Sequence, residues 1–185
     1  MDFTAYLKHF EAIIHHPAPE KPYDNPDYLN YTKLNWSRMH RWLKQGVLTT
    51  AMKDAVLAIF SPQQWIVITE PWCGDASHAI PFFQMMKEEN PFINISYELR
   101  DTSPFLINDY LTNGSKSIPK LIIRDEKGQD RATWGPRPAA CQELYNHLTA
   151  TKTDFETLKT ALQKWYNNDK GISMQEELLA LLQSI

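Results

Sequence analysis

The feature that most constrains the fold is a cysteine placed between a short β-branched segment and an amphipathic helix pattern. Residues 65–69 are Trp-Ile-Val-Ile-Thr, which predicts a buried central strand, and Pro71 ends it. Residues 76–89 carry apolar side chains at helical spacing, so a helix follows almost at once. Cys73 lies between the two elements, and we therefore expect its sulfur at the N-terminus of that helix.

This position predicts thiol chemistry. The first N–H groups of a helix have no partner within the helix, and the helix dipole is positive there, so a thiolate is stabilised and nucleophilic near neutral pH. Gly74 permits a tight turn that leaves the sulfur accessible. We therefore expect Cys73 to be an exposed, reactive thiol. The carboxylates of Glu70 and Asp75 act on its pKa in the opposite direction, so the sign of the net shift stays open.

The rest of the pattern predicts an α/β layered fold with helices at both ends. Before residue 65 we expect helices from Phe3 to before Pro17, at 26–44 and at 49–60. Beyond residue 89 we expect strands at 92–99, 121–123 and 131–134, a short helix at 108–113, and helices after Pro138, at 154–167 and at 174–182. The first two strands are expected to be parallel and the last two to form a hairpin.

Composition and charge bound the class of protein. The chain has 185 residues, 43% of them hydrophobic, which is enough for a core without a metal or a disulfide. The net charge of −3 gives no reason to expect nucleic acid or a membrane surface as partner. No apolar run approaches the roughly 18 residues of a membrane span, and the first thirty residues do not form a signal peptide. We therefore expect a cytoplasmic protein.

The two cysteines, Cys73 and Cys141, limit the redox and metal chemistry. Both are expected to be thiols in a reducing cytosol. They are not accompanied by clustered histidines, and the adjacent His15 and His16 do not share a helix face, so no zinc site is expected. We accordingly predict neither a metal nor a cofactor.

Three motifs in order resemble the thioredoxin superfamily. Residues 72–74, Trp-Cys-Gly, resemble the start of the family's Trp-Cys-Gly-x-Cys site. Residues 117–119, Ser-Ile-Pro, precede the predicted strand 121–123, where the family has a cis-proline facing the sulfur. Gly135 matches a glycine that lines the family's substrate groove. The resemblance covers roughly residues 55–150.

The resemblance implies a three-layer fold with a central mixed sheet over residues 61–150. Residues 1–60 are then a helical extension packed on this core, and residues 151–185 are C-terminal helices. Trp-Cys-Gly-Asp at residues 72–75 and Gly-Pro-Arg-Pro at residues 135–138 look similar to a bacterial subgroup of thioredoxin-like proteins.

The family's substrate groove is also implied. Its expected apolar lining is Trp72, Ile118, Pro119, Trp134 and Gly135, with Gly74 and Asp75 beside the sulfur. Backbone groups beside a cis-proline can pair with an extended chain. The implied partners are protein or small-molecule thiols and disulfides. Asp75 itself fits the role of a helix-start residue better than that of an acid catalyst.

The chain departs from the family pattern in the residues that complete a redox cycle. Ala76 replaces the second cysteine, so a mixed disulfide at Cys73 has no local thiol to resolve it. Val67 stands where the family has a buried acid, and His78 is at best a weak influence on the thiol. Cys141 can resolve that disulfide only if the two Cα atoms lie within roughly 7 Å; we favour a packing role for it.

Two functions follow from these observations. The first, which the sequence favours slightly, is a thiol-disulfide oxidoreductase or monothiol exchange protein that uses Cys73. The second is a non-catalytic binding or adaptor protein that keeps the groove and has lost the redox cycle. Ala76 and the helical extension support the second function.

Overall fold

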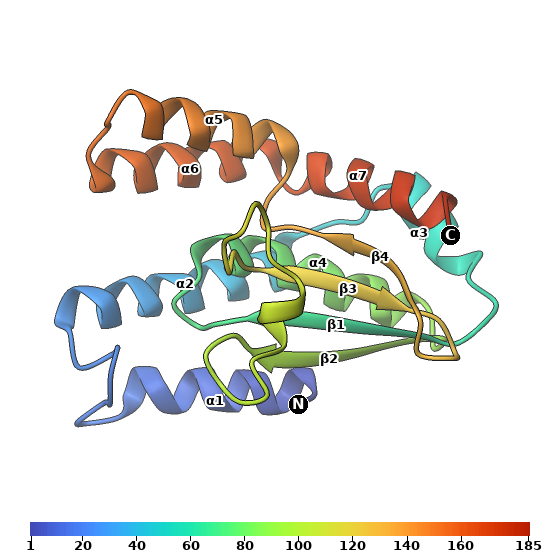
Figure 1. Ribbon diagram of the computed structural model, residues 1–185, viewed down its shortest axis with the longest axis horizontal. Coiled ribbons are helices and arrows are strands. Elements are labelled where there is room, and N and C mark those ends of the chain that lie inside the picture. The colour runs from blue at the N-terminus through green and yellow to red at the C-terminus, as the bar shows by residue number, and fades with distance from the viewer.

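A four-stranded mixed sheet forms the centre of the computed structural model, which describes all residues from Met1 to Ile185 (Figure 1). The strands lie in the order β2 (Ile93–Leu99), β1 (Gln63–Thr69), β3 (Lys120–Arg124) and β4 (Asp130–Trp134). β1 is parallel to β2 and antiparallel to β3, and β3 and β4 form an antiparallel hairpin. The predicted α/β arrangement and its strand directions are confirmed.

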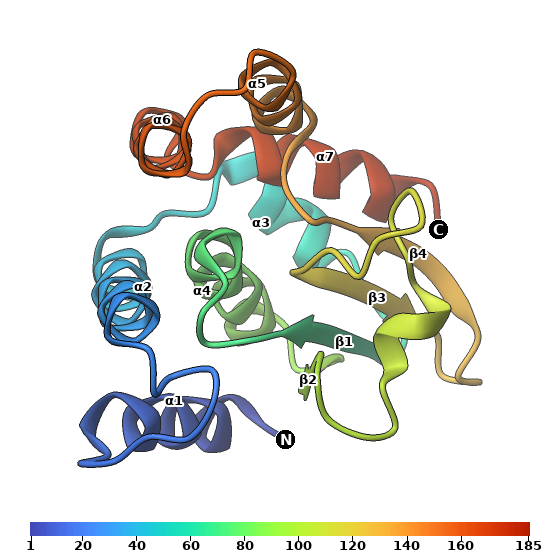
Figure 2. The ribbon, with the colours of Figure 1, turned by 60° about the vertical axis from the view of Figure 1, so that its left-hand side comes forward.

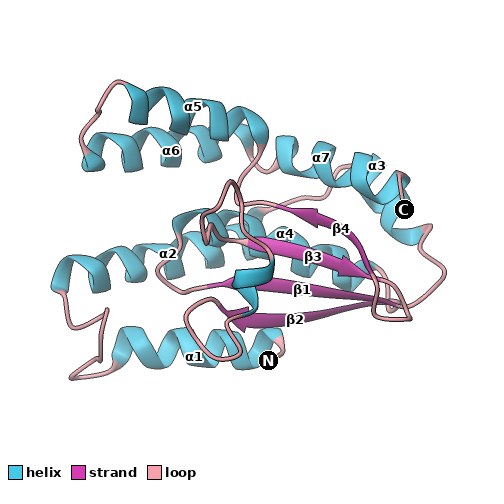
Figure 3. Cartoon of the chain, viewed as in Figure 1, coloured by secondary structure: helices cyan, strands magenta, loops and turns pink.

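Seven α-helices surround the sheet (Figure 3). They are α1 (Phe3–His15), α2 (Pro26–Gln45), α3 (Thr50–Leu57), α4 (Gly74–Glu89), α5 (Ala139–Ala150), α6 (Phe155–Asp169) and α7 (Ile172–Gln183). Side-chain caps fix several starts: the Asn25 side chain accepts the N–H groups of Asp27 and Tyr28, and Pro26 occupies the first helical position. The predicted helices are confirmed except in two places.

Two predicted helices are shorter than the sequence indicated. The third ends at Leu57 instead of Phe60, where the Asn90 side chain donates to the carbonyls of Val56 and Ile59. Phe60 consequently lies outside the helix and is 83% exposed. The short helix expected at 108–113 is a 3₁₀ turn, η1 (Leu106–Asp109), followed by a tight turn in which Asn113 and Gly114 have positive φ.

The N-terminal helices complete the hydrophobic core. Figure 2 shows α1, α2 and α4 on the same side of the sheet, with α1 near the β2 edge. Tyr6 and Phe10 of α1 are fully buried, and the Tyr6 ring stacks on Tyr97 of β2 with centroids 5.2 Å apart. Residues ahead of β1 therefore supply part of the core over which the site is built.

The C-terminal helices lie toward the β4 edge of the sheet, opposite the β2 edge. α7 lies against α3 (Figure 2), and the side chain of Gln175 accepts the N–H of Thr49 at 2.8 Å. α5 and α6 form an antiparallel pair that projects beyond the sheet (Figure 1). No helix combines the length and apolar character needed to cross a bilayer.

Candidate functional site

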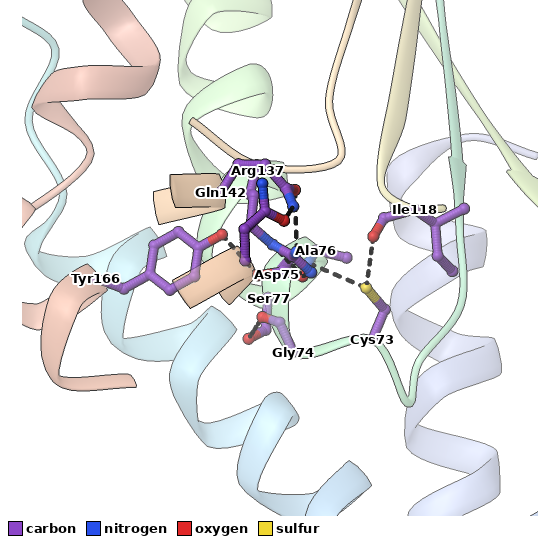
Figure 4. A network of polar contacts seen from close by, with 10 residues as sticks. Cys73, Gly74, Asp75, Ala76, Ser77, Ile118, Arg137, Gln142 and Tyr166 are labelled. Carbon is purple, nitrogen blue, oxygen red and sulfur yellow. Dashed lines mark hydrogen bonds and ion pairs between the residues drawn. The ribbon is translucent and has the colours of Figure 1, made fainter. Parts of the chain in front are cut away.

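Cys73 is the N-cap residue of α4, as the sequence predicts. Its sulfur accepts the N–H of Ala76 at 3.4 Å, and its S–H donates to the Ile118 carbonyl at 3.3 Å (Figure 4). The Ile118–Pro119 peptide bond is cis. The predictions that the sulfur lies at a helix N-terminus and that a cis-proline stands beside it are both confirmed.

The expectation of an exposed Cys73 is wrong. The residue is only 6% exposed, because the segment before Pro119 and the start of α4 close around the sulfur. Burial raises the pKa of the Cys73 thiol to about 12, and the Asp75 carboxylate adds to the increase. The N–H groups of Ala76 and Asp75 act in the opposite direction but do not offset the loss of hydration. At neutral pH the group is therefore a neutral thiol.

Asp75 is a structural anchor in the first turn of α4. Its Oδ2 accepts from Arg137 Nη2 at 2.5 Å, and its Oδ1 accepts from the Tyr166 hydroxyl at 2.7 Å (Figure 4). A third bond joins Arg137 Nη1 to the side chain of Gln142 at 3.1 Å. Asp75 therefore ties α4 to the segment after β4 and to α6, which agrees with a helix-start role.

A pocket of about 740 Å³ lies over Cys73. Four of the predicted residues line it together with the cysteine: Trp72, Gly74, Asp75 and Ile118. Ser117 and Arg137, which belong to the quoted motifs, also line it. The rest of the wall comes from residues that sequence reasoning did not connect with the site: Asn25, Asp27, Tyr28, Tyr31, Arg100, Ser115, Lys116, Tyr145, Phe155, Glu156 and Lys159. Seven of the 18 lining residues are hydrophobic, so the wall combines apolar surface with charged and polar groups.

The other predicted groove residues lie elsewhere. Trp134 and Gly135 line a second, adjoining cavity of about 480 Å³, and Pro119 lines neither cavity. The Trp134 side chain is buried, and its Nε1 donates to Glu177 of α7 at 2.7 Å. A helix outside the predicted thioredoxin-like segment thus holds this tryptophan. The cavity that it lines adjoins the pocket over Cys73, because both are lined by Ser115, Ser117, Arg137 and Tyr145.

One missed residue had a sequence signal. Arg100 directly follows β2, and parallel strands end at the same edge of a sheet, so Arg100 and the segment after β1 had to meet. By contrast, no local pattern connects Tyr31 of α2 with the turn at Gly74. A Cβ atom at Gly74 would overlap the Tyr31 hydroxyl, which shows how closely α2 covers the start of α4.

Two further groups near the site are buried. Glu70, expected to be more exposed, is 7% exposed; its carboxylate accepts the N–H of Asp101 at 2.9 Å, and burial raises its pKa. Cys141 is fully buried in α5 and, like Cys73, is a free thiol; burial raises its pKa to about 12. No group of three or more His, Cys, Asp or Glu side chains is arranged to hold a metal ion.

His78 binds neighbouring helices rather than the sulfur. Its Nδ1 accepts from Trp42 Nε1 at 2.8 Å, its Nε2 lies 3.2 Å from Gln163 Oε1, and its ring stacks on Tyr166. Burial lowers the pKa of His78 to about 3, and the positive charges of Arg38 and Arg41 lower it further. The ring is therefore neutral across the physiological range and joins α2, α4 and α6.

The neutral state of His78 predicts a loss of stability in mild acid. Between the folded pKa near 3 and the ordinary value of 6.5, the unfolded chain binds one more proton at this residue, so stability falls as pH drops below 6.5. The expected slope from His78 is about 1.4 kcal/mol per pH unit. Urea unfolding from pH 7 to pH 5 should show this slope reduced in His78→Gln. The exposed His147 provides the control: His147→Gln should keep the full slope, and equal slopes in both variants would contradict the prediction.

The strand β1, the cysteine at the N-cap of α4 and the adjacent cis-proline define a protein of the thioredoxin fold. A family model described as thioredoxin matches residues 22–154, and the chain belongs to this family. The matched segment begins within the region ahead of α2 and so takes in α2 and α3 as well as the sheet.

Two solved structures share the fold. An HIV epitope-scaffold protein is 14% identical with a TM-score of 0.58, covering 97% of this chain and 98% of its own. A protein of unknown function from Pseudomonas aeruginosa is 15% identical with a TM-score of 0.50, covering 88% of this chain and 92% of its own. At such identities the likeness concerns the fold alone. Comparison with curated proteins gives no match.

Proposed function

We propose that the chain is a thioredoxin-fold binding protein that takes up a ligand in the pocket over Cys73 without cycling between dithiol and disulfide. The observation that carries the proposal is the state of the sulfur: it is buried, and its S–H donates to the Ile118 carbonyl. Exchange requires the thiolate, and a pKa near 12 leaves about one thiolate in 10⁵ molecules at pH 7.

The surroundings of the sulfur support the same function. Ala76 occupies the place of a resolving cysteine, and Cys141 is a fully buried free thiol. α2 and the start of α6 supply six of the 18 residues of the pocket wall. The pocket that they help to line has a volume of about 740 Å³, which is within the usual size of ligand sites.

Alkylation of Cys73 tests the proposal. Compared with an ordinary thiol of pKa 9, Cys73 has a thiolate population lower by about 10³. The more basic thiolate is about twentyfold more nucleophilic. The alkylation rate is therefore expected to fall about fiftyfold, before the steric effect of burial is considered. Iodoacetamide at pH 7.5 should therefore modify Cys73 at least fiftyfold more slowly in the folded chain than in the same chain unfolded in urea. Peptide mass spectrometry separates Cys73 from Cys141. Faster reaction in the folded chain would overturn the proposal.

Thiol exchange through Cys73 is the second candidate. It is favoured by the N–H of Ala76, which points to the sulfur, and by the position of Cys73 on the pocket wall. A thiolate there would displace one half of a disulfide as a thiolate, and a second, external thiol would release the protein. This function predicts reduction of insulin by dithiothreitol that is accelerated by the protein and lost in Cys73→Ser. The binding function predicts equal rates for both proteins.

A further inference from the structure

We infer that the ligand of the pocket over Cys73 is a polyanion of small-molecule size. The inference deepens the proposed binding function and depends on it for the identity of the site. It comes from the cationic side chains that line the pocket, each supplied by a different segment: Arg100, Lys116, Arg137 and Lys159. The sign of the ligand's charge is inferred mainly from how these side chains are held in the pocket.

Three of these cations are held in place by aromatic rings of the same pocket. The Arg100 guanidinium lies 4.5 Å from the Trp72 ring centroid, and that of Arg137 lies 4.3 Å from the Tyr145 centroid. Lys159 Nζ lies 4.8 Å from the centroid of Tyr31. A cation fixed in this way has lost its side-chain entropy before a ligand arrives, so less affinity is spent on ordering it.

The aromatic faces are consequently less suited to a cationic ligand. A positive group entering the pocket would meet rings whose faces already carry Arg100 and Lys159, and like charges would repel it. The acids on the pocket wall do not reverse this preference. Asp75 and Arg137 neutralise each other in an ion pair, so this pair favours neither sign of ligand.

The two other acids lie at the outer rim. The Glu156 side chain is 80% exposed, whereas that of its partner Lys159 is 19% exposed. Asp27 is also exposed, in the first turn of α2. Charges in water are screened, whereas charges in a partly buried site act more strongly, so Lys159 contributes more to the field inside the pocket than Glu156 does.

Lys116 supplies the charge with the fewest competing partners. The other three cations each form an ion pair, Arg100 with Asp101, Arg137 with Asp75 and Lys159 with Glu156. Lys116 forms none; it is exposed and lies in the segment that leads to Ile118, whose carbonyl holds the Cys73 thiol. Carboxylates and phosphates both suit such a set of cations. A pocket of about 740 Å³ accommodates a small ligand with several such groups.

Calorimetric titration with three probes tests the inference: citrate, triglutamate and trilysine. Citrate or triglutamate should bind, with affinity falling at least threefold between 50 and 300 mM KCl, and trilysine should not bind. Citrate binding alone would assign a compact ligand, and tighter binding of triglutamate would assign an acidic peptide. Failure of both anions to bind at 5 mM, or equal binding of trilysine, would overturn the inference.

Charge-removing variants locate the binding. Lys116→Gln and Lys159→Gln should each weaken anion binding at least threefold, because each removes one of the pocket cations. Lys164→Gln is the matched control, since Lys164 is exposed on the same helix as Lys159 but lies outside the pocket. Equal affinity of all three variants would overturn the inference. If the protein instead accelerated insulin reduction in a manner that depends on Cys73, the proposed binding function would be wrong. The charge preference of the pocket could still be measured with the same titrations.

Discussion

Replacing Arg137 with methionine should lower the free energy of unfolding by about 3–5 kcal/mol, because the substitution leaves a buried carboxylate without its cation. Arg137 and Asp75 are each only 12% exposed at the side chain, and two guanidinium nitrogens donate to one Asp75 oxygen. After the substitution Asp75 keeps only the Tyr166 hydroxyl as a side-chain donor. Urea unfolding of the variant and the parent chain measures the loss.

A double-mutant cycle separates the ion pair from lost packing. Asp75→Asn removes the charge from the same site, so the double variant should be less destabilised than the sum of the two single variants, by at least 1 kcal/mol. Additive losses would contradict a coupled pair.

The surface pair of Arg131 and Asp125 is the control for burial. These side chains are 47% and 27% exposed, and their charged atoms lie 3.9 Å apart. Arg131→Met should cost less than about 1 kcal/mol, because exposed pairs are hydrated and screened. A similar cost for Arg131→Met and Arg137→Met would show that the energy at Arg137 comes from its stem and not from its charge.

The fold was predictable because its main signals are local. The β-branched run of β1, the turn at Cys73 and the helical spacing of α4 lie within 27 consecutive residues, from Gln63 to Glu89. The cis-proline before β3 was also expected, from the resemblance of Ser117-Ile118-Pro119 to the thioredoxin motif. Each of these features depends on neighbours in the sequence.

The state of the sulfur was not predictable in this way. Its burial depends on Ile118, which is 45 residues away, and the pocket above it depends on α2 and α6. The sequence shows that a helix N-terminus is present, but the pKa of Cys73 reflects the competition between that N-terminus and the loss of water. Desolvation is a property of the tertiary structure, so the expected exposed thiolate became a buried thiol.

Replacing Gly135 with alanine should cost about 3 kcal/mol in unfolding free energy, for two reasons that act together. Its φ of +112° is a backbone conformation that side chains with a Cβ rarely adopt. An added Cβ would also overlap the carbonyl oxygen of Pro119, which is main chain and cannot turn aside. Urea unfolding at constant m-value is the measurement.

Gly128 provides the matched control for that experiment. Its φ is +75°, and no atom lies within 4 Å of an added Cβ, so Gly128→Ala should cost only about 1–2 kcal/mol for the left-handed backbone. Equal losses at the two glycines would show that Pro119 yields without cost. A larger loss at Gly135 would show that the Pro119 main chain shifts at a cost, and that shift would carry the adjacent Ile118 carbonyl away from Cys73. Alkylation of that thiol should then be faster in folded Gly135→Ala than in the folded parent chain, which ties the strength of this contact to the reactivity of the sulfur.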